Sequence, residues 1–146
     1  MSTPNYQLID TADKVRAACE KLRPYPAVGF DTETTSLDPY SGRVRLIQLA
    51  APDHPPFLFD LDRLATGGAV GESEALKPLR ELLAAARPVK IAHNAKFDAK
   101  WIRRQLGVEL GGLFDTLLAS QIVSAGDTED RHSLAVVAER YLGQAM

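Results

Sequence analysis

The chain has 146 residues, of which 45% are hydrophobic and 25% are charged, and its formal net charge is −2. These values are typical of one globular domain with one core, and they argue against a broad basic surface that coats duplex nucleic acid. No apolar run approaches the roughly 18 residues of a membrane span, and the N-terminus lacks the pattern of a secretory signal. A cytoplasmic location is therefore expected.

Apolar periodicity and capping residues predict an alternation of strands and helices. Asp10 or Thr11 is placed to cap the first helix, Ser133 to cap the last, and Gly143 to end it. The expected strands are 6–9, 27–32, 44–50, 57–59 and 89–93, and the expected helices are 11–22, 76–83, 94–106, 117–123 and 133–142. The Asp-Pro-Tyr-Ser-Gly turn at 38–42 favours antiparallel pairing of the strands that flank it. A three-stranded antiparallel unit followed by strand–helix units predicts an α/β fold, with a mixed sheet and helices packed on its faces.

Two acidic residues lie at the end of the apolar strand that begins at Ala27. Asp31 and Glu33 occupy positions i and i+2, so their carboxylates are expected to project to one side while Phe30 projects to the other. Adjacent carboxylates repel each other, and a divalent cation such as Mg²⁺ or Mn²⁺ relieves that repulsion. Alternatively, the strand ends at Phe30 and both acids are solvated loop residues.

A third acid follows the strand at 89–93. With Asn94 as the cap of the next helix, Asp98 falls in the opening turns, and its neighbours at helical spacing, Trp101 and Ile102, are expected in the core. An unpaired acid beside the core is costly, and a metal ion is one partner that would satisfy it. The alternative is an acid favoured by the helix N-terminus. If the two strands are neighbours, the three acids converge at one edge of the sheet.

Several blocks of the sequence resemble the DnaQ-like, or DEDD, superfamily of 3′→5′ exonucleases. The blocks are Phe30-Asp31-Thr32-Glu33-Thr34 with Leu37, His93-Asn94-Ala95-Lys96-Phe97-Asp98, Phe114-Asp115-Thr116, and the stretch from His132 to Gly143. The match runs from about Tyr6 to Gly143 and is greatest to the proofreading domains of family A DNA polymerases, followed by RNase D enzymes. The resemblance implies an RNase H-like fold and release of nucleotides from single-stranded 3′ ends, with DNA favoured over RNA.

The resemblance also implies roles for individual residues. Asp31, Glu33 and Asp98 would be the catalytic residues and the ligands of two Mg²⁺ or Mn²⁺ ions, which stabilise the attacking and leaving oxygens of an in-line displacement. Asp115 is expected to support the fold instead of binding metal. The residues that would contact the terminal nucleotide are Thr32 through its backbone, Thr34, Leu37 and Asn94.

The third motif of the superfamily, Tyr-x-x-x-Asp or His-x-x-x-x-Asp, has no counterpart near the end of this sequence. His132 and Tyr141 lack the aspartate at the required spacing, because Val137 and Ala145 stand there. The expectation is a single exonuclease-like domain over 1–146, C-terminally truncated and lacking the helix of the third motif. A polymerase domain or a partner chain would supply the missing segment. The alternative is a catalytically incomplete module that binds nucleic acid or acts as a scaffold.

The helix expected at 94–106 also carries a basic side formed by Lys96, Lys100, Arg103 and Arg104. Such side chains can approach a phosphate backbone. Lys96 is closest to the predicted site, whereas Arg103 and Arg104 are interpreted as part of a solvated helix face.

Overall fold

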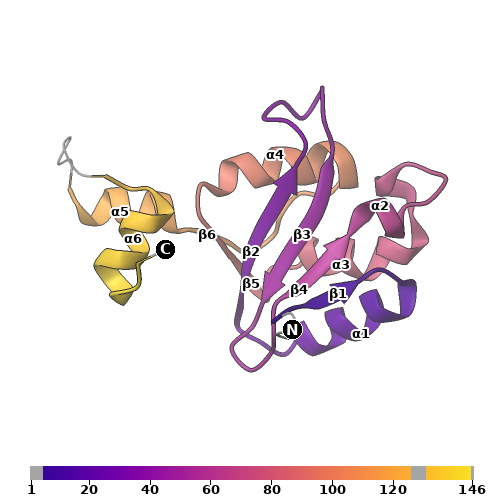
Figure 1. Ribbon diagram of the computed structural model, residues 1–146, viewed down its shortest axis with the longest axis horizontal. Helices are drawn as coiled ribbons and strands as arrows, with labels where there is room; N and C mark the ends of the chain where they lie inside the picture. Colours follow the sequence, from indigo (N-terminus) through magenta and orange to yellow (C-terminus); the bar gives the residue numbers. More distant parts are fainter. Residues whose placement is uncertain (1–4, 126–130, 146) are drawn as a thin grey trace.

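A computed structural model describes residues 5–125 and 131–145 of the chain. Its described residues form a six-stranded sheet in the order β1-β4-β3-β2-β5-β6 (Figure 1). The strands are β1 (Gln7–Ile9), β2 (Ala27–Thr34), β3 (Val44–Ala50), β4 (Phe57–Asp60), β5 (Val89–Ala92) and β6 (Leu113–Asp115). β3 is antiparallel to β2 and to β4, whereas β1–β4, β2–β5 and β5–β6 are parallel. The expected mixed sheet is confirmed.

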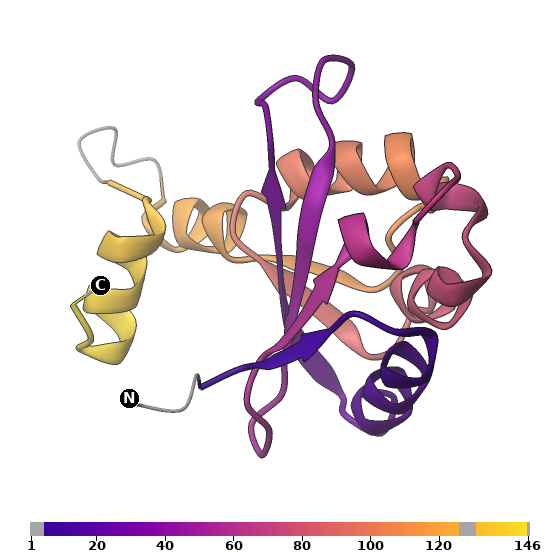
Figure 2. The ribbon, with the colours of Figure 1, turned by 45° about the vertical axis from the view of Figure 1, so that its right-hand side comes forward.

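Helices cover one face of this sheet and stand beside its β6 edge. They are α1 (Ala12–Leu22), α2 (Leu61–Leu64), α3 (Lys77–Ala84), α4 (Ala95–Leu106), α5 (Thr116–Val123) and α6 (Leu134–Leu142), with 3₁₀ segments η1 (Val70–Glu72) and η2 (Glu74–Leu76). In Figure 2 the sheet is seen nearly edge on, with α1 to α4 on one side and α5 and α6 on the other. The apolar stripes of α1, α3 and α4 are buried against the sheet. These helices and the sheet together form one hydrophobic core.

Several expected caps are present. The Thr11 side chain accepts a hydrogen bond from the Lys14 N–H at the start of α1, and Ser133 does the same for Val136 at the start of α6. Gly143 ends α6 in the left-handed region, with φ of 66°. These caps agree with the prediction because they depend on residues only a few positions apart.

Besides the two 3₁₀ segments, one strand and one helix were not predicted. The strand β6 is three residues long and α2 is four, which is too short for either to show a clear hydrophobic period. β6 exists because Gly111 and Gly112 let the chain pass against the backbone of Ala84 to Ala86, where a Cβ atom at either glycine would collide with carbonyl oxygens. This close approach places β6 beside β5 and therefore sets the position of Asp115.

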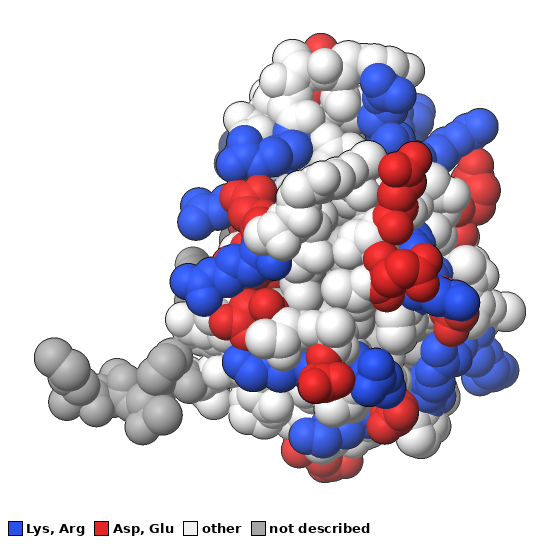
Figure 3. Space-filling model, turned by 90° about the vertical axis from the view of Figure 1, so that its right-hand side faces the viewer, with Lys and Arg blue, Asp and Glu red and all other residues white. Residues whose placement is uncertain are grey.

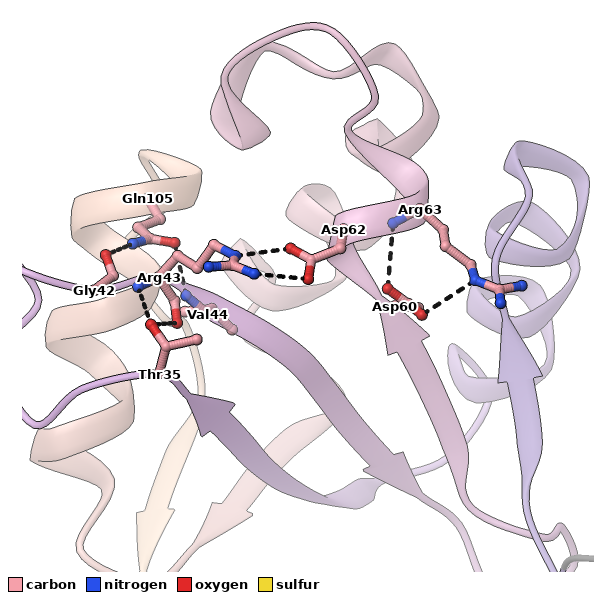
Figure 4. Close-up of polar contacts among 8 residues, drawn as sticks. All are labelled: Thr35, Gly42, Arg43, Val44, Asp60, Asp62, Arg63 and Gln105. Carbon is pink, nitrogen blue, oxygen red and sulfur yellow. Dashed lines mark hydrogen bonds and ion pairs between the residues drawn. The ribbon is translucent and has the colours of Figure 1, made fainter.

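The loop between β2 and β3 is attached to the last turn of α4 (Figure 4). The Gln105 side chain donates to the carbonyl of Gly42 at 2.9 Å and accepts from the N–H of Val44 at 2.8 Å. Arg43 also pairs with Asp62 at the start of α2, at 2.9 and 3.1 Å. The loop that follows the acidic end of β2 is thus held at its base from two sides.

Charges of both signs intermingle on the face that lies to the right in Figure 1 and toward the viewer in Figure 3. Exposed ion pairs such as Arg16–Asp13 and Arg23–Glu81 also place opposite charges side by side on the protein surface. This face therefore lacks the extended positive potential with which a protein coats duplex nucleic acid.

The α5–α6 pair projects beyond β6, as Figures 1 and 2 both show. A groove between the two helices has an almost entirely apolar lining that includes Val123, Leu134 and Leu142. The two helices remain joined to the sheet through His93, whose Nε2 donates to the carbonyl of His132 at 2.8 Å. Within residues 5–125 and 131–145, none of the helices combines the length and the apolar character needed to cross a membrane.

Candidate active site

The end of β2 separates its acids from the core by simple alternation. Phe30 and Thr32 are buried against the helices, whereas Asp31 and Glu33 are exposed on the opposite side. The strand continues through Thr34, so the alternative in which it ends at Phe30 is wrong. The pairing of β2 with β3 shifts between Glu33 and Thr34. Such an irregularity bends the strand locally at the point where the acids emerge.

Asp98 approaches the same strand end from the helix side. It lies in the first turn of α4, on the face that carries Trp101 and Ile102, and it is only 3% exposed. The Thr32 hydroxyl donates a hydrogen bond of 2.6 Å to Asp98 Oδ1. This is a buried contact between residues 66 positions apart, and it fixes the aspartate against β2.

The electrostatics of the site disfavour the ionised carboxylates. Burial raises the pKa of Asp98 to about 6, and the nearby charge of Asp31 adds to this effect, while the hydrogen bond from Thr32 opposes it. Partial burial also raises the pKa of Asp31, which lies at an exposed position of the strand, and the charge of Glu33 raises it further. The neighbouring charges that act on both aspartates are thus negative, which is the situation that a bound cation would relieve.

The structure brings the predicted acids together only in part. Asp31 is close enough to Asp98 to influence its ionisation, and Glu33 influences Asp31. Glu33 also accepts a hydrogen bond of 3.2 Å from Gln48 on β3. Within the described part of the chain, no group of three or more His, Cys, Asp or Glu side chains is arranged to hold a metal ion. The metal-binding role of the three acids therefore stays a prediction.

Asn94 occupies the expected N-cap position of α4 but does not cap it with its side chain. Its backbone adopts the left-handed region, with φ of 62° and ψ of 48°, and its side chain makes no cap hydrogen bond. Asp115 takes this role instead, because its carboxylate accepts from the N–H groups of Asn94 at 3.1 Å and Ala95 at 2.9 Å. Asparagine tolerates the left-handed region better than most residues. The sharp turn leaves the Asn94 side chain exposed to solvent.

Asp115 joins the starts of two helices. Besides its bonds to α4, it caps α5 by accepting from the N–H groups of Leu117 at 2.8 Å and Leu118 at 3.4 Å. Four backbone donors therefore converge on one carboxylate, which agrees with the expected role of Asp115 in supporting the fold.

The remaining predicted nucleotide contacts lie along the chain that leaves β2. Thr34 is half-buried and donates to the carbonyl of Ser36 at 2.8 Å, so its hydroxyl orders the start of the loop. Leu37 is 86% exposed at the outer side of that loop. Such exposure leaves an apolar side chain available for contact with a base.

The sequence resemblance predicts only a backbone contact for Thr32 and no role for Gln48. The structure shows that the Thr32 side chain binds Asp98 and that Gln48 lies opposite Asp31 in the register of the sheet. A signal for Gln48 was present, because it is a polar residue in the otherwise apolar second half of β3, opposite an acidic strand end.

Replacement of Thr32 by valine is expected to destabilise the protein by about 1 to 3 kcal/mol at neutral pH. Valine keeps the branched shape but removes the donor, so the buried Asp98 carboxylate loses its 2.6 Å hydrogen bond. Urea unfolding would measure the loss. Thr32→Ser keeps the hydroxyl and is the matched control, and an equal loss in both variants would show that packing, not the hydrogen bond, is responsible.

The family described as 3′-5′ exonuclease matches residues 6–146. Ribonuclease D of Nitrobacter hamburgensis is 29% identical over 121 residues, which are 83% of this chain and 29% of that protein. DNA polymerase I of a Synechocystis strain is 32% identical over 141 residues, which are 92% of this chain and 14% of that protein. The solved structure of Escherichia coli RNase D, described as an exoribonuclease involved in structured RNA processing, is 27% identical and superposes with a TM-score of 0.75. The superposition covers 97% of this chain and 34% of the chain in the RNase D structure.

The chain belongs to the 3′-5′ exonuclease family and has the RNase H-like fold that its resemblance to the DnaQ-like superfamily implied. It spans 29% of the length of the Nitrobacter ribonuclease D and 14% of the length of the Synechocystis DNA polymerase I. Because the relatives include both ribonuclease D and DNA polymerase I, they do not support the expected preference for DNA over RNA.

Proposed function

We propose that this protein is a metal-dependent 3′→5′ exonuclease that releases nucleotides from single-stranded 3′ ends. The observation that carries the proposal is the approach of Asp98 from α4 to the strand end that bears Asp31 and Glu33. Two elements far apart in the sequence thereby place acids at one edge of the sheet, where α/β folds commonly bind ligands. The family to which the chain belongs depends on divalent metal ions.

The donor set suits a hard divalent cation. Carboxylate oxygens are the ligands that Mg²⁺ and Mn²⁺ prefer, and the raised pKa values of Asp31 and Asp98 indicate acids that lack a compensating positive charge. Asp31, Glu33 and Asp98 would hold the ions, and bound ions would lower the pKa of the attacking water and stabilise the leaving oxygen.

Other residues of this chain hold the proposed metal ligands in place. Thr32 holds the Asp98 carboxylate against β2, and Gln48 holds Glu33 from the neighbouring strand. Thr34, Leu37 and Asn94 would contact the terminal nucleotide, Leu37 through its exposed apolar side chain. Fixed carboxylates are needed because small displacements of ligands and reacting groups cost rate steeply.

Labelled single strands of DNA and of RNA would test this proposal. With Mn²⁺ or Mg²⁺ present, we expect stepwise shortening of 5′-labelled strands from the 3′ end, and a loss of roughly 100-fold or more in Asp31→Asn. Asp13→Asn, which changes an exposed aspartate on α1, is the matched control. Equal activity of the wild type and Asp31→Asn would refute the role of these acids, and shortening from the 5′ end would refute the polarity.

A second candidate function is a nucleic-acid-binding or scaffold module that does not cleave. It is favoured by the finding that the described residues include no group of three or more potential ligands arranged for one metal ion. The same experiment separates the two functions, because this candidate predicts that strands bind but keep their length in the presence of either metal.

A further inference from the structure

A groove lies between the β2–β3 loop and the outer surface of α4, apart from the three acids. Its volume is about 760 Å³. Its lining residues are Leu37, Asp38, Pro39, Tyr40, Lys100, Arg103 and Arg104. The loop directly continues β2, and Leu37 lies only four positions after Glu33. A strand whose end reaches the acids would therefore meet this groove next along the loop.

The loop wall of the groove is well ordered by its own hydrogen bonds. The Asp38 N–H donates to Ser36 Oγ at 3.1 Å, and the Tyr40 N–H donates to Asp38 Oδ1 at 3.0 Å. Gln105 attaches the end of the loop to α4, as Figure 4 shows. The groove is thus preformed, so binding would not require the loop to be ordered first.

The chemistry of the groove combines an aromatic ring with cations. The Tyr40 side chain is exposed, and the guanidinium carbon of Arg104 lies 5.0 Å from the centre of its ring. Arg104 and Lys100 are one helical turn apart on α4, so they line the same wall. The third cation, Arg103, is paired with Glu109 at 3.0 Å, and the one lining carboxylate, Asp38, is engaged by the Tyr40 N–H.

An exposed aromatic ring bordered by cations is the arrangement with which proteins bind single-stranded nucleic acid, through base stacking and phosphate pairing. We propose that this groove binds the nucleotides that lie 5′ of the one to be removed, with a base stacked on Tyr40 and phosphates paired with Arg104 and Lys100. The proposal rests on the proposed function, since it gives the groove the same strand. It also revises the interpretation of Arg104 as part of a merely solvated helix face.

Fluorescence anisotropy in EDTA separates binding from cleavage. The probes are 5′-fluorescein-labelled oligo(dT) and oligo(rU) of about 12 nucleotides and the corresponding trinucleotides, because one such site spans about 4 to 16 nucleotides. We expect Tyr40→Ala to weaken binding of the longer strands roughly five- to tenfold and to leave the trinucleotides unaffected, whereas Tyr40→Phe keeps the ring and binds like the wild type. If only oligo(dT) or only oligo(rU) loses affinity in Tyr40→Ala, that probe shows whether the groove accepts deoxyribose or ribose.

The salt dependence of the binding constant distinguishes the contribution of the Arg104 charge from that of the Tyr40 ring. Arg104→Ala is expected to weaken binding and to reduce the slope of log K against log salt by about 0.7, the value for one phosphate of a single strand. Tyr40→Ala should leave that slope unchanged. Arg16→Ala, which removes an exposed arginine from α1, is the control for loss of charge and should not alter binding. Thermal unfolding would confirm that all variants fold.

The outcomes for the groove and for the exonuclease activity are separable. If Tyr40→Ala and Arg104→Ala bind the longer strands like the wild type, or if trinucleotides bind as tightly as longer strands, the groove proposal is wrong even when the wild type cleaves. If both variants lose affinity while the wild type leaves every strand intact in Mn²⁺, the groove binds nucleic acid and the proposed exonuclease function is wrong.

Discussion

Replacement of Asp98 by asparagine is expected to stabilise the metal-free protein while it strongly reduces metal-dependent hydrolysis. Asparagine has the same shape, and its carbonyl oxygen can still accept the hydrogen bond from Thr32, so only the charge is removed. The buried charge is unfavourable, because the pKa of Asp98 rises from its ordinary value of 3.8 to about 6 on folding. One pKa unit corresponds to about 1.4 kcal/mol, so the gain at pH 7.5 is at most about 3 kcal/mol.

The same shift fixes the sign of the pH dependence. Between pH 3.8 and about 6 the folded protein holds a proton on Asp98 that the unfolded chain has released. The stability that this proton provides is therefore complete below pH 3.8 and is lost as the pH rises through about 6. Urea unfolding in EDTA across this range should show the decline in the wild type. In Asp98→Asn a smaller decline should remain, because the pKa of Asp31 is also raised.

Metal ions should reverse the ranking of the two proteins. A cation bound by the ionised acids stabilises the folded state by mass action, so Mn²⁺ is expected to raise the melting temperature of the wild type more than that of Asp98→Asn. Hydrolysis by the variant should fall roughly 100-fold or more. An unchanged pH dependence in Asp98→Asn would contradict the assignment of the shift, and equal stabilisation by Mn²⁺ would contradict the assignment of the ligand.

Replacement of Asp115 by alanine is expected to cost about 3 to 4 kcal/mol of stability, because it removes the cap of two helices at once. Its carboxylate accepts from two backbone N–H groups at the start of α4 and from two at the start of α5. Asparagine at 115 can keep the bonds made by Oδ1 but not the Oδ2 bond to Ala95, so an intermediate loss of about 1 to 2 kcal/mol is expected. Urea unfolding measures both variants.

Asp13→Ala is the matched control for these variants. Asp13 is exposed on α1, and among the described residues its ion pair is with the exposed Arg16, so its removal should change the free energy of unfolding by less than about 0.5 kcal/mol. A loss in Asp115→Ala no larger than in Asp13→Ala would show that the carboxylate is not what holds the two helix starts together.

The parts of the site that depend on local pattern were predictable from the sequence. The alternation along β2 placed Asp31 and Glu33 on one side, and the helical spacing of Trp101 and Ile102 placed Asp98 on the buried face. Both inferences use only the periods of regular structure, which a few neighbouring residues define. The mixed sheet followed in the same way from the order of strands and helices.

The parts that depend on contacts between distant segments were not predictable. The cap of α4 comes from Asp115, about twenty positions away, and its presence depends on β6, a strand too short to show a period. The stacking of Arg104 on Tyr40 likewise joins α4 to the β2–β3 loop, which Gln105 also attaches to α4. No periodicity in a single sequence encodes such pairs, because they join elements whose relative position the fold alone determines.

The carboxylate of Asp115 binds the starts of both α4 and α5, so the position of the first turn of α4 depends on the position of α5. If the α5–α6 pair tilted, the Asp115 carboxylate would pull on the N–H groups of Asn94 and Ala95. Asp98 lies only three residues after Ala95, in the same turn. The start of the helix that carries Asp98 is therefore joined through one side chain to the start of the outer helix pair.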